Sequence, residues 1–137
     1  MGAFIRQSNR LLFLDSSVLI DALTGPRTGW HRLAALVDRG ERIAISALVL
    51  YEWLRRERTQ VELETFHTLV PEARIVPFEH IQAALSANYY RSLPRGRARS
   101  LDFGIAACAV IHDLPLWTYN RADFADIPGL RLFAPAL

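Results

Sequence analysis

Four acidic residues occupy places in the sequence where a carboxylate is unusual. Asp15 directly follows the apolar run at residues 11–14, and Glu52 interrupts an otherwise apolar stretch. Asp102 shares a predicted helix face with apolar side chains, and Asp123 lies in a turn-like segment after an apolar one. Carboxylates that share a site repel one another, so one takes up a proton unless a cation intervenes. Oxygen ligands without His or Cys select Mg²⁺ or Mn²⁺ over zinc, which predicts a divalent-cation site.

Each of these acids also has an ordinary structural explanation. Asp15 could cap the helix that follows it, and Asp102 could cap the helix on which it lies. Glu52 could pair with Arg56 at i,i+4 spacing, a contact worth only about 0.3–0.5 kcal/mol. Asp123 could serve in a turn. The shared site is favoured by the joint arrangement, because every acid lies at a strand end, a helix start or an apolar helix face.

The composition excludes several other chemistries. All 16 Lys+Arg positions are arginine, so a Schiff-base lysine, a P-loop lysine and the lysine of phospho-aspartate receivers are absent. Haloacid-dehalogenase-type phosphatases are excluded for the same reason. Cys108 is the only cysteine, which rules out a disulfide framework and a thiolate metal site and suits a core position. The four histidines show no ligand spacing.

The bulk properties predict one globular domain. The chain has 137 residues, of which 51% are hydrophobic and 22% charged, enough to bury a sizeable core. The net charge of +2 is only mildly basic. We find no secretion signal and no apolar run of membrane-spanning length, so we expect a cytoplasmic protein. The high apolar content indicates a surface covered by a second copy or another protein.

Apolar runs alternate with helical patterns along the chain, which predicts an α/β fold. Helices are expected near residues 18–24 and 30–39, over 79–92, and after the capping residues Ser46, Thr59 (with Glu62) and Ser100. Residues 94–99 are expected to form a basic loop. The expected strands cover residues 11–14, 43–45, 73–76, 115–118 and 130–133. The prediction is a single domain with a central parallel sheet of four or five strands and helices on both faces.

Binding sites in such sheets form beyond the carboxyl ends of the strands. This rule selects Asp15, which directly follows the first strand, and the segment 118–123 after the fourth. Ser17, Thr118 and Asn120 supply neutral oxygens nearby that could orient water.

Four sequence blocks resemble the motifs of PIN-domain nucleases, in the family's order and over nearly the whole chain after residue 10. In length and in the absence of other domains, the chain is most similar to the VapC toxins of bacterial toxin–antitoxin pairs. The extra residues 1–10 depart from the usual short start, so we interpret them as an N-terminal extension of a nuclease domain at 11–137. The four blocks are residues 14–21, 46–54, 101–107 and 118–124.

The resemblance implies an RNA-cleaving enzyme that uses Mg²⁺ or Mn²⁺, forms a homodimer and is silenced by a VapB-type antitoxin. It assigns a metal-site role to the four acids and a supporting role to three polar residues. We expect Asp15 and Asp102 to be the principal metal ligands, with Glu52 and Asp123 acting through water or orienting the base. The residues that match the family's site positions are Asp15, Glu52, Asp102 and Asp123 as catalytic acids, and Ser17, Thr118 and Asn120 as supporting polar groups.

A basic segment lies just before Asp102, next to two tyrosines. Arginines can neutralise RNA phosphates, and a tyrosine can stack on an unpaired base. A solvated loop without a function is the alternative. The candidate RNA contacts are Arg91, Arg95, Arg97 and Arg99.

Two other functions compete with a toxin. One is a PIN nuclease that processes RNA in the cell without a toxin role, and the other is a non-catalytic PIN scaffold that binds RNA or protein. Catalysis is favoured because all four acidic positions carry an acid.

Overall fold

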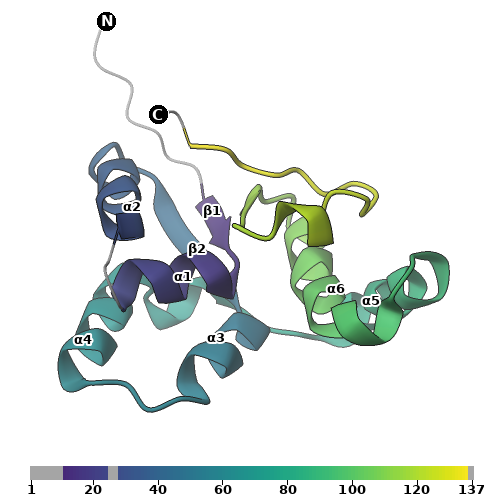
Figure 1. Cartoon of the computed structure of the whole chain (residues 1–137), viewed down its shortest axis with the longest axis horizontal. Helices are drawn as coiled ribbons and strands as arrows, with labels where there is room; N and C mark the ends of the chain where they lie inside the picture. The colour runs from purple at the N-terminus through teal and green to yellow at the C-terminus, as the bar shows by residue number, and fades with distance from the viewer. Residues whose placement is uncertain (1–10, 25–27, 136–137) are drawn as a thin grey trace, which may run out of the picture.

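The computed structural model describes residues 11–24 and 28–135. Four strands form one parallel sheet in the order β3-β2-β1-β4, with β1 near its centre (Figure 1). The predicted α/β class and parallel sheet are therefore confirmed, whereas the extension at 1–10 and the helix break at Gly25-Pro26 lie outside the described residues. The strands are β1 (Leu11–Leu14), β2 (Arg42–Ser46), β3 (Ile75–Val76) and β4 (Leu116–Trp117).

Strand β1 is covered on both faces, as its unbroken apolar sequence predicts. Leu12, Phe13 and Leu14 are fully buried. On one side β1 pairs with β2 and on the other with β4, so the first and last strands are neighbours. Parallel pairing places their carboxyl ends at the same edge of the sheet.

The prediction of a strand at 130–133 is wrong, because these residues do not form a regular strand. In the described chain, Leu132 makes an isolated parallel bridge to Leu116 and adds no named strand. The expected strand at 73–76 shortens to β3, because residues Glu72–Arg74 form a 3-10 turn that begins after Pro71. The sheet therefore has four strands, one of the two numbers predicted.

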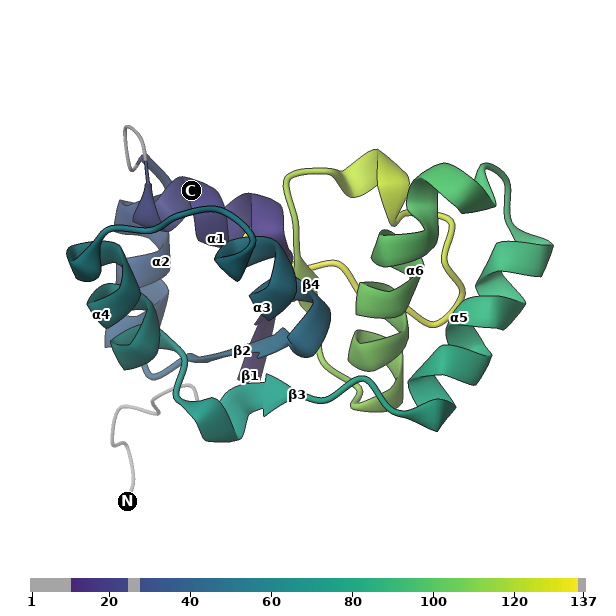
Figure 2. The same cartoon turned by 90° about the horizontal axis from the view of Figure 1, so that it is seen from below.

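Helices cover both faces of the sheet, as predicted. The helices α1 to α4 gather on one side, while α5 and α6 pack together on the other side (Figures 1 and 2). Within the first group α1 contacts α2, α3 and α4. The helices are α1 (Ser16–Leu23), α2 (Thr28–Asp38), α3 (Ala47–Leu54), α4 (Gln60–Leu69), α5 (His80–Ser92) and α6 (Gly96–Ile111).

Two of the predicted helix starts are confirmed by their caps. The buried Ser46 hydroxyl accepts hydrogen bonds from the backbone N–H groups of Leu48 and Val49, which starts α3 directly after β2. Thr59 and Glu62 form the predicted capping box of α4. Helix α3 ends at Leu54.

The predicted basic loop and the predicted cap at Ser100 are wrong. Helix α6 begins at Gly96, so the basic segment forms its first turn and Ser100 lies inside the helix. The preceding Arg95 adopts a left-handed conformation with φ 59° and turns the chain into the helix. Arg99 explains the early start, because its buried side chain packs over the Phe103 ring one turn later.

Candidate active site

Asp15 lies at the carboxyl end of β1 and is 2% exposed. Although it occupies the N-cap position of α1, its side chain makes no capping hydrogen bond. Its Oδ2 instead accepts hydrogen bonds from the hydroxyls of Ser17 at 2.9 Å and Thr118 at 2.7 Å. The carboxylate therefore accepts hydrogen bonds from side-chain hydroxyls and not from the backbone N–H groups of α1, which removes the simple capping explanation.

The polar residues predicted to support Asp15 form a short network between β1 and β4. The Asp15 N–H donates to the Trp117 carbonyl at 3.0 Å, which fixes the two strand ends together. The Ser17 Oγ accepts from the backbone N–H of Tyr119 at 3.1 Å. The Thr118 Oγ1 accepts from the backbone N–H of Asn120 at 3.0 Å. Asn120 thus contributes a main-chain donor, although its side chain was the predicted group.

Asp102 carries the strongest electrostatic signal of the site. Burial, together with the charges of Asp15, Asp123 and Glu52, raises its pKa from 3.8 to about 7, while the charge of Arg99 opposes the shift. Because it lies in the second turn of α6, it cannot cap that helix. Because the charges of the other three acids raise the pKa of Asp102, these carboxylates lie close enough to Asp102 to repel it.

Glu52 projects from α3 into the same region. Burial raises the pKa of its carboxyl, the charge of Asp15 raises it as well, and a hydrogen bond from Ser16 lowers it. The expected partner Arg56 is wrong, since the ion pair forms with Arg55 at 3.8 Å. One oxygen, Oε1, is buried and has no hydrogen-bond partner. A buried carboxylate oxygen without a donor is poised to accept a proton or contact a cation.

Asp123 approaches from the segment that follows β4. It ends a 3-10 turn, Arg121–Asp123, and its backbone N–H donates to the Asn120 carbonyl at 3.0 Å. Its side chain does not cap that turn; Oδ1 lies 3.4 Å from Nη2 of Arg95. The Asp123 side chain is 37% exposed, compared with 15% for that of Glu52, so Asp123 stands at the rim of the site.

The chemistry of these side chains fits a hydrated divalent cation. The candidate ligands are oxygens, and the mutual repulsion at Asp102 and the unpartnered Glu52 oxygen both call for positive charge. Within residues 11–24 and 28–135, no group of three or more His, Cys, Asp or Glu side chains is placed to hold a metal ion. Mg²⁺ usually binds through one or two carboxylates and retains several waters. In a site of that kind Asp15 and Asp102 would hold the cation, and the remaining acids would reach it through water.

The contributions of Ser16 and Asp126 were missed from the sequence, and Arg99 was predicted only as an RNA contact. Ser16 forms a hydrogen bond with Glu52. In the sequence, only its position between the candidate residues Asp15 and Ser17 could have indicated this contact. Arg99, whose side chain is 2% exposed, forms an ion pair beside Asp123 with Asp126, whose side chain is 43% exposed. Nothing in the sequence pairs these two residues, since they meet only after the chain returns past β4.

The structure also corrects the predicted RNA-contacting arginines. Arg99 is 2% exposed and its guanidinium is occupied by Asp126 and by backbone carbonyls. It therefore cannot reach a phosphate in solution, and its predicted RNA contact is wrong. Arg91, Arg95 and Arg97 are exposed around the end of α5 and the start of α6.

Comparison with known proteins agrees with this geometry. The family model of the PIN domain matches residues 12–130. The chain is 33% identical over 120 residues to "Ribonuclease VapC19" of Mycobacterium tuberculosis, a match that covers 86% of this chain and 95% of that protein. The protein belongs to the PIN-domain family.

Solved structures show the same fold. A toxin–antitoxin complex from Klebsiella pneumoniae matches with a TM-score of 0.68 and 26% identity, covering 91% of this chain and 98% of that chain. DNA-bound VapBC from Salmonella typhimurium matches with a TM-score of 0.67 and 20% identity, covering 92% of this chain and 98% of that chain. The second likeness concerns the fold alone. No helix in the described parts of the chain is long and apolar enough to cross a membrane.

Proposed function

We propose that this PIN-domain protein is a metal-dependent ribonuclease of the VapC type, the toxin of a toxin–antitoxin pair. The observation that carries the proposal is the raised pKa of Asp102, to about 7, caused by burial and by Asp15, Asp123 and Glu52. Such a cluster is destabilising without a cation and useful with one. The similarity to VapC19 supports the choice of RNA as substrate.

In the proposed reaction, water attacks an RNA phosphodiester, a P–O bond to the water oxygen forms, and the P–O bond to the leaving ribose oxygen breaks. A bound divalent cation supplies a lowered water pKa and stabilises charge on the leaving oxygen. Asp15 and Asp102 would hold the cation, and the Ser17 and Thr118 hydroxyls keep the Asp15 carboxylate oriented. Glu52, with its free Oε1, accepts the proton that water releases.

Divalent-metal dependence is general among VapC-type PIN ribonucleases. We propose Mg²⁺ or Mn²⁺ as the specific ion, because the candidate ligands are all hard oxygens. We further propose that the four acids are the catalytic set, with Ser17, Thr118 and Asn120 in support. Because Asp102 has to ionise to bind metal, affinity should fall as the pH drops below about 7.

The partners follow from the same proposal. A VapB-type antitoxin silences the enzyme, as suggested by the toxin–antitoxin complexes that share the fold. We also propose a homodimer, a cytoplasmic location where the RNA substrate is found, and a domain that starts at residue 11. A PIN nuclease of RNA processing is the competing function, and an antitoxin reading frame next to the gene would separate the two.

Exposed arginines near Asp123 are proposed to contact RNA phosphates. Arg91 lies in the last turn of α5, Arg95 directly precedes α6 and Arg97 lies in the first turn of α6; all three are exposed. Arg95 already pairs with Asp123 at the rim of the site. Neutralising all three should reduce the salt dependence of RNA affinity. An unchanged slope of log affinity against log salt would remove them from the RNA site.

Cleavage of total RNA by wild type and by Asp15→Asn, in Mg²⁺, Mn²⁺ or EDTA, tests the proposed function. We expect wild type to cut RNA in either metal, EDTA to stop it, and Asp15→Asn to be folded and inactive. Asp38→Asn, which changes an exposed acid on α2, is the matched control and should cut normally. Full activity of Asp15→Asn, or cleavage that persists in EDTA, would refute the proposal.

A further inference from the structure

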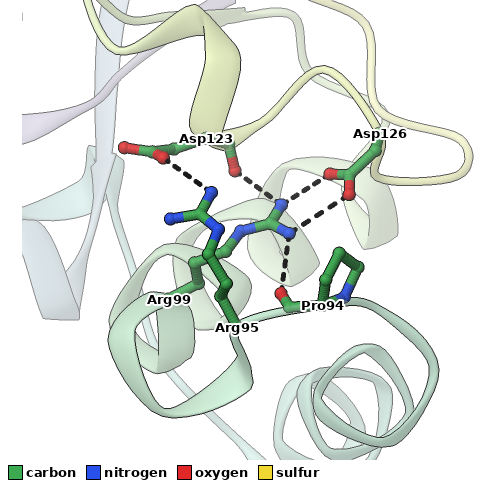
Figure 3. A network of polar contacts seen from close by, with 5 residues as sticks. All are labelled: Pro94, Arg95, Arg99, Asp123 and Asp126. Atoms are coloured by element: carbon green, nitrogen blue, oxygen red, sulfur yellow. Dashed lines mark hydrogen bonds and ion pairs between the residues drawn. The ribbon is translucent and has the colours of Figure 1, made fainter.

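Arg99 makes four hydrogen bonds from a buried position in the first turn of α6 (Figure 3). Its Nη2 donates to the Asp123 carbonyl oxygen at 2.8 Å and to Asp126 Oδ1 at 2.5 Å. Its Nη1 donates to Asp126 Oδ2 at 3.1 Å and to the Pro94 carbonyl oxygen at 3.1 Å. A single planar guanidinium thus joins the start of α6 to the segment that carries Asp123.

The Arg99 guanidinium is contacted both by its own helix and by Asp126. The Cζ of Arg99 lies 4.7 Å from the centre of the Phe103 ring, on the same helix as Asp102. Asp126 binds the guanidinium through both oxygens, a geometry that only arginine provides. Arg99 precedes Asp102 by less than one helical turn. Its contacts therefore connect the supports of two acids that approach the site from different parts of the chain.

A role in stability alone does not explain which groups Arg99 contacts. The Arg99 guanidinium binds the main-chain carbonyl of Asp123. The Asp123 carboxylate does not bind Arg99 and pairs with Arg95 at the rim of the site. The segment between β4 and Leu132 contains only one short 3-10 turn among its described residues. The position of Asp123 thus depends on side-chain contacts of this kind.

We propose that Arg99, clamped by Asp126, is a positioning residue that fixes Asp123 relative to Asp102 for RNA cleavage. The proposal rests on the ribonuclease function proposed above. Lysine in place of Arg99 keeps the charge but cannot bind both oxygens of Asp126 and the Asp123 carbonyl together. Asparagine in place of Asp126 keeps the shape but removes the charge that orients the guanidinium.

Steady-state kinetics on Arg99→Lys and Asp126→Asn are the first test. A misplaced reacting group costs up to about 100-fold in rate, so we expect kcat to fall by about 10- to 100-fold in Arg99→Lys and less in Asp126→Asn. The KM for RNA should change little, because Arg99 is buried away from solvent. Arg131→Lys is the matched control, since Arg131 also binds an aspartate, Asp113, and its carbonyl. Its kcat should equal that of wild type.

A double-mutant cycle separates positioning from general stability. If Arg99 acts through Asp123, adding Arg99→Lys to Asp123→Asn should lower kcat little further, although thermal stability still falls. Effects on kcat that multiply would overturn the proposal.

Amide hydrogen exchange gives a reading that does not depend on activity. Arg99→Lys should speed exchange across residues 121–126 and leave α3 protected as in wild type. Unchanged exchange at 121–126 would overturn the proposal. If wild type does not cleave RNA but Arg99→Lys still speeds exchange at residues 121–126, the proposed ribonuclease function fails, whereas the role of Arg99 in holding this segment stands.

Discussion

Replacing Asp102 by asparagine should stabilise the metal-free protein while abolishing RNA cleavage. Burial, and then the charges of Asp15, Asp123 and Glu52, raise the pKa of this carboxyl from 3.8 to about 7. The unfolded chain ionises it above about pH 4, whereas the folded protein keeps the proton until about pH 7. Raising the pH between these values therefore favours the unfolded state, and the destabilisation is complete above pH 7. Asparagine has the same size and no charge, so the variant escapes this loss.

The size of the effect follows from the two pKa values. Each step of one in pKa corresponds to about 1.4 kcal/mol, so the change from 3.8 to about 7 sets an upper limit of about 4 kcal/mol. The Asp102 side chain is partly exposed, and solvent screening reduces the expected gain to about 2 kcal/mol. For a domain of this length, that gain raises Tm by roughly 8 °C.

Urea unfolding in EDTA at pH 5 and pH 8 measures this gain. The free energy of unfolding of Asp102→Asn should exceed that of wild type by about 2 kcal/mol at pH 8, and by less at pH 5. The exposed Asp38→Asn variant serves as the control and should not show a gain that grows over this range. A destabilised Asp102→Asn protein, or a gain independent of pH, would refute the claim that the four carboxylates repel one another at one site.

Two further predictions concern the supports of the acids. Thr118→Val removes the hydroxyl that donates to Asp15 at 2.7 Å. Since a hydrogen bond to a charged group is worth about 1.5–3 kcal/mol, kcat for RNA should fall by about 10-fold or more. Thr68→Val, at an exposed position of α4, should leave kcat unchanged. Ser46→Ala removes the cap of α3 and should lower the free energy of unfolding by about 1 kcal/mol, measured by thermal unfolding. Ser100→Ala should change it by less than about 0.5 kcal/mol, because Ser100 lies exposed inside α6, and an equal loss at both serines would contradict the assignment of the caps.

The strand-end positions were predictable because they depend on local sequence. The apolar run before Asp15 requires a buried strand, and a parallel sheet places ligands beyond strand ends. The position of Thr118 followed in the same way from β4. Direct pairing of β1 with β4 brings these two residues within hydrogen-bonding distance. The sequence predicted a parallel sheet but not the order of its strands, so it did not predict this hydrogen bond.

The segment before Asp102 was not predictable, because its conformation depends on contacts with distant residues. Pro94, Gly96 and three arginines are typical of a loop when considered alone. The turn of helix there is held by Arg99, whose partner Asp126 is 27 positions away in the chain. The predicted partner of Glu52 was wrong because the i,i+4 spacing to Arg56 assumes a continuous helix, whereas α3 ends at Leu54 and the ion pair forms with Arg55.

A calorimetric titration of Mn²⁺ into the protein at pH 8 tests the central claim most directly. We expect wild type to bind the ion with measurable heat, and Asp15→Asn and Asp102→Asn to lose that binding while remaining folded. If both variants bind Mn²⁺ as wild type does, the acids at the ends of β1 and on α6 do not form a metal site.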